Sequence, residues 1–248
     1  MTEPLHLVSF DLDPAGVFGW SRARRLQELD GDLGYAVHAT LKAVFQDRAP
    51  RPFRVVRYRP RSLHVLAYSV HTAATLSEHA RAFAAPEAFG ACRWSDVVSK
   101  PMPTRFAAGQ RLGFEVRACP VRRIAQRGPL KRERAEVDAF LARSWEAGDA
   151  PVDRETVYRD WVAEELKRSE AATVAGLRVA SWTRVELHRQ DHGEPRHAHS
   201  LQRPDVLVDG ELVVESPAGF ARLLARGLGR HRAFGFGMVL LRPPRGTG

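Results

Sequence analysis

Apolar residues recur along the first hundred positions with two periods, one typical of strands and one of helices. Residues 5–12 alternate apolar and polar side chains, which predicts a strand, and the apolar positions of 33–45 recur at helical spacing behind Asp32, a candidate N-cap. Residues 17–32 are expected as a loop or a short helix. The same patterns predict strands at 53–60 and 62–70, a helix at 71–84 and a short strand at 94–100. The order β-α-β-β-α-β is that of a ferredoxin-like unit.

A second unit of the same order is expected after residues 101–109, whose prolines and glycine indicate a linker. Its expected elements are a strand from 110, a basic and mostly helical segment over about 122–170, a strand at 175–189, a strand pair over 203–216 that turns at Asp209-Gly210, a helix from Pro217 and a last strand at 236–243. We therefore expect an α+β fold of two tandem ferredoxin-like domains, 1–104 and 105–248, with an enlarged basic helical insertion in the second.

The charge balance indicates the kind of partner. The 248 residues carry 38 lysines and arginines against 29 acidic residues, a formal net charge of +9. Such an excess predicts a polyanionic partner, most often nucleic acid, with a merely arginine-rich surface as the alternative. No apolar run approaches the roughly 18 residues of a membrane span, and the first residues show no secretory signal. Cys92 and Cys119 form no metal-type or redox-type pair, so we expect reduced thiols in a cytoplasmic protein without membrane contact.

The stretch "GLGRHRAFGFGM" at 227–238 combines glycines with Arg230, His231 and Arg232. A loop that binds a mononucleotide follows a strand and opens a helix, whereas this loop follows a predicted helix and precedes a strand. Arg232 also stands where a G-x-G-x-x-G motif requires its third glycine, so we do not expect a mononucleotide site. Two interpretations remain: a loop whose backbone and cations approach a phosphate chain, or glycines that only cap the helix and fit an edge strand.

Three segments resemble one family and keep its order along the chain. "GLGRHRAFGFGMVLL" resembles the C-terminal glycine-rich signature of the CRISPR-associated RAMP proteins. "GYAVHATLKAVF", with Tyr35 and His38, is similar to the Y-x-x-H-x-x-L-x-x-x-F helix of the CasE (Cse3) type of CRISPR repeat-RNA endoribonuclease. "GFEVRACPVRR" at 113–123 resembles that family's strand with an R-A-x-P turn. Since 122–170 looks longer than in compact CasE proteins, the processing nuclease of type IV CRISPR systems is a related possibility.

The resemblance implies a fold of two ferredoxin-like domains and a function in RNA processing. The expected protein binds a CRISPR repeat hairpin and cleaves it at the 3′ side of the stem by attack of the RNA's own 2′-hydroxyl. The products would be a 2′,3′-cyclic phosphate or 3′-phosphate and a 5′-hydroxyl. No metal and no cofactor are needed for this chemistry, and the product crRNA is expected to stay bound, with other subunits of an effector complex as partners. The alternative is a non-catalytic RAMP subunit that only binds crRNA; a general RNA-binding protein is a third interpretation.

His38 is the expected acid–base residue, because an imidazole titrates near neutral pH, and Tyr35 lies one helical turn before it. Arg24 is the expected catalytic arginine. Whether His38 acts as base or acid, and which arginine stabilises the transition state, stays open. The expected RNA contacts are Arg22, Arg25, Arg122, Arg123, Arg127, Lys131, Arg132, Arg134, Gly227, Gly229, Arg230, His231, Arg232 and Arg242.

Each of these interpretations has an alternative. The basic run from Arg122 to Arg134 is expected on a helix that tracks an RNA groove, or else on a solvated face softened by Glu133 and Glu136. The cluster His188, Asp191, His192, His197 and His199 matches no zinc spacing, so we expect a polar loop and no metal site. The tryptophans expected in the core are Trp94, Trp145, Trp161 and Trp182.

Overall fold

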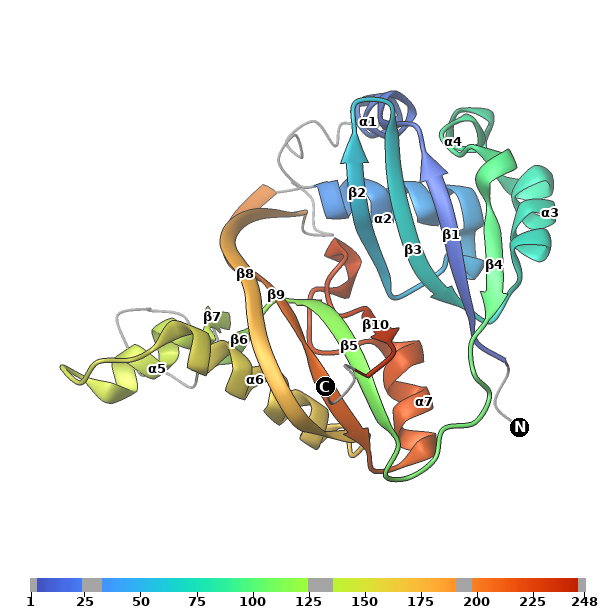
Figure 1. The fold of residues 1–248 in the computed structure, drawn as a ribbon. Helices are drawn as coiled ribbons and strands as arrows, with labels where there is room; N and C mark the ends of the chain where they lie inside the picture. The colour runs from blue at the N-terminus through green and yellow to red at the C-terminus, as the bar shows by residue number, and fades with distance from the viewer. Residues whose placement is uncertain (1–3, 24–32, 125–135, 191–197, 245–248) are drawn as a thin grey trace.

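The computed structural model describes residues 4–23, 33–124, 136–190 and 198–244. For 21–23, 188–190 and 198–201 it describes the backbone alone. Within these ranges the chain forms two four-stranded antiparallel sheets that lie side by side, each with helices packed against it (Figure 1).

The first half forms the first sheet, with the strand order β2-β3-β1-β4. This order is that of a ferredoxin-like unit, as the sequence predicts. Its elements in chain order are β1 (His6–Leu12), α1 (Pro14–Ala23), α2 (Leu33–Phe45), η2 (Gln46–Arg48), β2 (Phe53–Arg59), β3 (Ser62–Ser69), α3 (Ala73–Phe83), α4 (Pro86–Gly90), η3 (Trp94–Asp96) and β4 (Val98–Pro101).

Alternation of burial explains why the strand prediction for the first sheet is confirmed. Along β1 the side chains of Val8, Phe10 and Leu12 are fully buried, with partly exposed residues between them. Burial of one such side chain contributes about 1.5–3 kcal/mol. Residues 17–32 are expected as a loop or a short helix, and the structure shows that 17–23 belong to helix α1. Helix α4 has no counterpart in the sequence prediction, and η3 occupies the first residues of the strand expected at 94–100.

The second half forms the second sheet, with the order β10-β5-β9-β8, which is again the ferredoxin-like order. Its elements in chain order are β5 (Arg111–Ala118), β6 (Val121–Arg123), β7 (Glu136–Asp138), α5 (Ala139–Ala147), α6 (Arg154–Arg168), β8 (Ala172–Gln190), β9 (Ala198–Val214), α7 (Pro217–Arg226), η4 (Arg232–Phe234) and β10 (Val239–Arg242). The fold class of tandem ferredoxin-like units is therefore confirmed.

The strand pair expected over 203–216 is wrong. Residues 203–214 belong to the single strand β9, which lies between β5 and β8, and Asp209-Gly210 lies within that strand. Asp209 accepts a hydrogen bond from Arg178 Nη2 at 3.0 Å across the ladder. At Gly210 a Cβ would lie 2.1 Å from the carbonyl oxygen of Gly176, so the glycine permits close approach to β8 rather than a turn.

The segment 122–170 is only partly helical in the described residues. Arg122 and Arg123 lie on strand β6, which pairs with β7, so the helix expected to carry them is a two-stranded ladder. The helical pieces that follow are α5 and α6. Asp153 caps α6 as predicted, because its Oδ2 accepts a hydrogen bond from the Thr156 backbone N–H at 2.7 Å.

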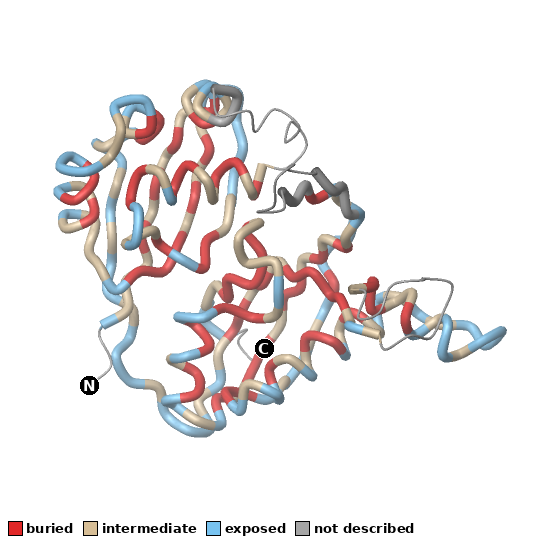
Figure 2. Tube along the Cα trace, turned by 180° about the vertical axis from the view of Figure 1, so that it is seen from behind, coloured by how far each residue is buried: buried red, intermediate tan, exposed pale blue. Residues whose placement is uncertain are grey.

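Buried contacts join the two halves. The Tyr68 hydroxyl on β3 donates to the Val239 carbonyl on β10 at 2.8 Å, and Arg54 on β2 contacts Glu115 on β5 at 2.7 Å. Figure 2 shows buried positions following the central strands of both sheets. The first sheet ends at Pro101 and the second begins at Arg111, so the domain boundary at 104/105 stays a prediction made between them.

The tryptophans divide between the core and the surface. Trp161 is 5% exposed and Trp94 packs against the first core, as expected. The placement of Trp145 and Trp182 in the core is wrong, since their exposed fractions are 37% and 43%. The Arg154 guanidinium covers the Trp182 ring at 4.5 Å. Among the described residues, no helix is long and apolar enough to cross a membrane.

Candidate functional site

Helix α2 carries the two residues that the sequence singles out for chemistry. Its core side includes Val37 and Leu41, both at most 1% exposed, whereas Tyr35 and His38 are only partly buried at the edge of that side. The ring centroids of Tyr35 and His38 are 6.3 Å apart. The His38 ring also lies nearly parallel to the Phe53 ring, at 6.4 Å and 11°. The His38 imidazole therefore lies between an aromatic ring of its own helix and one of β2.

The glycine-rich loop 227–237 has a conformation that its glycines permit. Gly227, Gly229, Gly235 and Gly237 all have positive φ angles. A Cβ on Gly229 would lie 2.5 Å from the Trp161 ring, and one on Gly237 would lie 2.2 Å from the Leu228 carbonyl oxygen. Backbone conformation and packing therefore account for these glycines, and a contact of Gly227 or Gly229 with RNA stays a prediction.

The loop packs directly against the start of α2. At Gly34 a Cβ would lie 2.1 Å from the Phe234 carbonyl oxygen, so only glycine allows η4 to approach the helix this closely. The Phe234 ring lies 5.7 Å from the Tyr35 ring and 5.9 Å from the His231 ring. Two segments about two hundred residues apart in the sequence therefore form one surface.

A cleft of about 850 Å³ opens between α2, the start of β2 and the loop. The residues that line it are His38, Arg51, Pro52, Phe53, Ala225, Arg226, Gly229, Arg230, His231, Arg232 and Ala233. Six of these side chains are arginine or histidine, and none is acidic. The structure thus brings His38 together with the loop cations that the sequence predicts as RNA contacts, whereas Tyr35 is not one of the residues that line the cleft.

Two of the cleft arginines were missed by the sequence interpretation. Arg51 comes from the connection between η2 and β2, where its backbone N–H donates to the Tyr68 carbonyl at 2.8 Å. Arg226 is the last residue of α7, and its carbonyl accepts a hydrogen bond from Arg232 Nη1 at 2.9 Å. The position of Arg226 just before the first loop glycine was a usable signal in the sequence. Arg51 carries no comparable signal, because its distance from the loop depends on the tertiary fold.

Burial and neighbouring cations lower the pKa values of two side chains in the cleft. Burial, followed by the charges of Lys42 and Arg51, lowers the pKa of His38 below its ordinary value. Burial and the charges of Arg226 and Arg51 likewise lower the pKa of Arg232. A lowered pKa leaves the His38 imidazole uncharged at neutral pH, which is the form that accepts a proton.

Glu136 on β7 anchors one wall of the cleft. Its carboxylate accepts a hydrogen bond from Arg230 Nη1 at 2.5 Å and lies 2.9 Å from His231 Nε2. Arg123 and Arg203 lie 3.8 and 3.9 Å from the same carboxylate. Burial acts to raise the pKa of Glu136, but His231, Arg230 and Arg203 together outweigh it and lower the pKa. Glu136 therefore stays ionised and holds Arg230 and His231 on the loop.

Two other predicted RNA contacts, Arg122 and Arg242, do not line the cleft and make ion pairs. Arg122 on β6 lies 3.3 Å from Glu164, and Arg242 on β10 lies 2.5 Å from Glu115. The Arg22 backbone is at the end of α1, without a described side chain. The predicted residues that lie outside the described ranges are Arg24, Arg25, Arg127, Lys131, Arg132 and Arg134.

Neither a metal site nor a reactive thiol is found in the described part of the chain. No group of three or more histidine, cysteine or acidic residues in it could hold a metal ion. Asp191, His192 and His197 lie outside the described ranges, and His188 and His199 have described backbone only. Burial, with the charges of Asp96 and Asp11, raises the pKa of the Cys92 thiol to about 12, so this cysteine is not a nucleophile at neutral pH.

The cleft combines an uncharged imidazole with a wall of guanidinium groups. Guanidinium groups suit phosphate oxygens, so the lining fits a ligand that carries phosphate. A family model described as "CRISPR associated protein" matches residues 6–243. The chain belongs to this CRISPR-associated family.

A protein with a similar sequence is itself a CRISPR-associated protein. The chain is 29% identical over 146 residues to the CRISPR-associated endoribonuclease Cse3 of Thermus thermophilus, a match that covers 58% of this chain and 61% of that protein. The match thus spans less than two thirds of that relative's length.

Solved structures of CRISPR proteins share the fold of this chain. The CRISPR endoribonuclease Cse3 bound to a 19-nucleotide RNA has a TM-score of 0.63 at 23% identity, and the match covers 97% of this chain and 100% of that one. A chain of a CRISPR RNA-guided surveillance complex has a TM-score of 0.56 at 15% identity, with 96% and 99% covered. These likenesses confirm the tandem ferredoxin-like fold expected for a CRISPR-associated protein of the CasE (Cse3) type.

Proposed function

We propose that this protein is an endoribonuclease that binds a CRISPR repeat hairpin and cleaves pre-crRNA at the 3′ side of the stem. The observation that carries the proposal is the cleft, in which the only described acid–base groups are His38 and His231 and the other charged groups are arginines. His231 is held by Glu136, which leaves His38 as the group positioned for proton transfer. The sequence similarity to the Cse3 endoribonuclease supports the same activity.

The chemistry follows from what each side chain can do. The uncharged His38 imidazole takes the proton from a ribose 2′-hydroxyl, and the 2′-oxygen attacks the adjacent phosphorus. The bond to the 5′-oxygen breaks, that oxygen takes up a proton from water, and His38 returns its proton to the solvent. The products are a 2′,3′-cyclic phosphate and a 5′-hydroxyl. This balance of atoms requires no metal ion and no cofactor.

The arginines stabilise the charge that develops on the phosphorane. Arg51 and Arg232 lie on the cleft wall with His38, and Arg226 joins them from the end of α7. Preorganised donors of this kind lower the barrier because they require no reorganisation during the reaction. Arg24 stays a further candidate from the predicted set. Tyr35, whose ring centroid lies 6.3 Å from that of His38, stays a further candidate whose hydroxyl would orient the 2′-hydroxyl or donate to the phosphate.

The basic segment around β6 and β7 is the proposed contact for the hairpin stem. The strand pair ends at Arg123 and Glu136, and four further basic residues, Arg127, Lys131, Arg132 and Arg134, lie between them in the sequence. A-form RNA is recognised mostly through its shape and phosphates. We include retention of the product crRNA, assembly with other subunits of an effector complex and a cytoplasmic location in the proposal. The surveillance-complex chain of similar fold supports the assembly.

The test is cleavage of a repeat hairpin by the purified full-length chain in EDTA. We expect one cut at the 3′ side of the stem, a 2′,3′-cyclic phosphate or 3′-phosphate on the upstream fragment, and no cut in a scrambled hairpin of equal length. Tight binding without any cut would instead establish the non-catalytic crRNA-binding subunit. Equal affinity for unrelated hairpins would indicate a general RNA-binding protein.

A further inference from the structure

We propose that the groove between α6 and α7 is a second RNA subsite, which takes the single-stranded segment that continues from the reacting phosphate. The proposal rests on the proposed function, because it needs RNA in the His38 cleft. The groove has a volume of about 550 Å³, about the size of a site that encloses one small molecule, so it fits one or two nucleotides and excludes a duplex.

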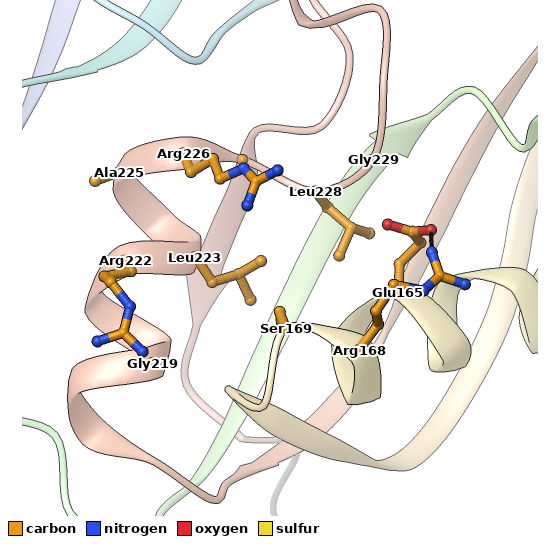
Figure 3. A pocket seen from close by; sticks show the side chains of 11 residues that line it. Glu165, Arg168, Ser169, Gly219, Arg222, Leu223, Ala225, Arg226, Leu228 and Gly229 are labelled. Carbon is orange, nitrogen blue, oxygen red and sulfur yellow. Dashed lines mark hydrogen bonds and ion pairs between the residues drawn. The ribbon is translucent and has the colours of Figure 1, made fainter.

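Figure 3 shows how the groove is built. Arg222 and Arg226 extend from α7 on one side, Glu165 and Arg168 lie on α6 on the other, and Leu223 lies between them. Leu223 is 5% exposed and the neighbouring Leu228 is 2% exposed, so the floor is apolar and closed. Such a groove offers an apolar surface to a base or ribose and cations to a phosphate.

The charges of the groove favour an anion. The side chain of Arg222 makes no ion pair or hydrogen bond within the described residues, and neither does that of Arg226. Glu165 is the one acidic residue of the lining, and it is paired with Arg168 on its own helix. The groove therefore carries uncompensated positive charge on its α7 side.

Continuity with the cleft selects RNA over an unrelated anion. Ala225, Arg226 and Gly229 line both the groove and the His38 cleft. A strand whose phosphate lies beside His38 can pass Arg226 and enter the groove without leaving cationic surface. An acidic peptide would meet the same charges, but nothing would connect it to the cleft.

The experiment compares two RNAs, a repeat hairpin trimmed at the cleavage position and the same hairpin with single-stranded extensions. To prevent cleavage, a 2′-deoxy nucleotide replaces the one at the cleavage site. For the unmodified chain we expect the extended RNA to bind more tightly. The Arg222→Gln variant is expected to reduce the ratio of the two affinities about fivefold and to lower the salt slope for the extended RNA by about 0.7, the value for one single-strand phosphate that the protein no longer neutralises.

The matched control is Arg81→Gln, which removes an exposed arginine from the last turn of α3 and should leave the ratio unchanged. An Arg222→Gln variant whose affinity ratio and salt slope equal those of the unmodified chain would overturn the proposal. If the unmodified chain binds neither hairpin, the proposed function has failed instead, and the two failures are therefore distinguishable. Extensions placed separately on the 5′ and 3′ sides identify the strand that enters the groove.

Discussion

The protonation state of His38 is the residue-scale feature on which the proposed chemistry depends. Burial and two nearby cations, Lys42 and Arg51, lower its pKa, and Phe53 lies parallel to its ring. The imidazole is therefore uncharged at neutral pH and can accept a proton from a 2′-hydroxyl. The sequence leaves open whether His38 is the base or the acid. The lowered pKa favours the base.

Removal of the Lys42 charge should change the pH dependence of cleavage. The lowered pKa of His38 means that the single-turnover rate falls only when the pH drops below the ordinary range of histidine. In Lys42→Gln one cation that disfavours the imidazolium is gone, so the pKa of His38 rises and the acid limb moves to higher pH by a fraction of a unit. The measurement is the single-turnover cleavage rate between pH 4.5 and pH 8, taken at intervals of about half a pH unit.

Lys100→Gln, on β4, is the matched control for this change and should leave the acid limb in place. An acid limb that stays in place in Lys42→Gln, or moves to lower pH, would show that His38 is not the titrating base.

Of the residues at the candidate site, the sequence predicts those that belong to a local motif. Tyr35 and His38 share one helix and one motif, so their spacing on the helix follows from the sequence. Arg51 and Glu136 belong to no motif, and their roles arise when α2, β7 and the loop come together. From the sequence, Glu136 is expected to reduce the positive charge of a basic helix. In the structure its carboxylate contacts Arg230 and His231 instead.

Among the elements, those with a repeating apolar pattern are predicted well. Strand β1, helix α2 and helix α7 follow their periodicity closely. The prediction fails where the partner is remote in sequence. Asp209-Gly210 has the composition of a turn, but hydrogen bonds to β5 and β8 on both sides keep it extended. Arg122 and Arg123 look helical beside a basic run, and pairing with β7 makes them a strand.

Neutralising basic residues of β6 and of the sequence between β6 and β7 in one variant, called the ladder variant, should weaken RNA binding. The variant Arg122→Gln, Arg123→Gln, Lys131→Gln, Arg132→Gln is expected to bind the repeat hairpin less tightly, with the salt slope reduced by about 0.7–0.9 for each phosphate that is no longer neutralised. The measurement is the dissociation constant at several salt concentrations. A slope equal to that of the unmodified chain would show that this segment does not contact phosphate.

A control with the same change of charge separates local contact from overall charge. It replaces four exposed cations of the first half and the linker by glutamine, namely Arg61, Arg81, Lys100 and Arg105. This variant should keep more of the salt slope than the ladder variant does.

For the whole molecule, the site exists only while the two halves are docked. His38 and Arg51 come from the first half, whereas Arg226 and Arg232 come from the second. The sequence predicts both β-α-β-β-α-β units, because each arises from local periodicity and short connections. It does not predict how the units dock, since the docking depends on single contacts such as that of Tyr68 with Val239.

Tyr68→Phe should destabilise the protein through this junction. The Tyr68 side chain is 1% exposed and its hydroxyl donates to the Val239 carbonyl, which loses this donor in the variant. We expect the free energy of unfolding to fall by about 1–3 kcal/mol, measured by urea denaturation. Tyr58→Phe, at a position 60% exposed, is the matched control and should have little effect. Equal stability of Tyr68→Phe and the unmodified chain would contradict the assignment of this contact.

The central claim is that His38 transfers the proton in RNA cleavage, and its replacement tests that claim most directly. The measurement is the single-turnover rate of repeat-hairpin cleavage in EDTA for His38→Ala, with the dissociation constant of a non-cleavable hairpin measured in parallel. We predict that cleavage is abolished, a loss of about 100-fold or more, and that affinity stays nearly intact. Full cleavage by His38→Ala would contradict the claim and would transfer the chemistry to the arginines of the cleft.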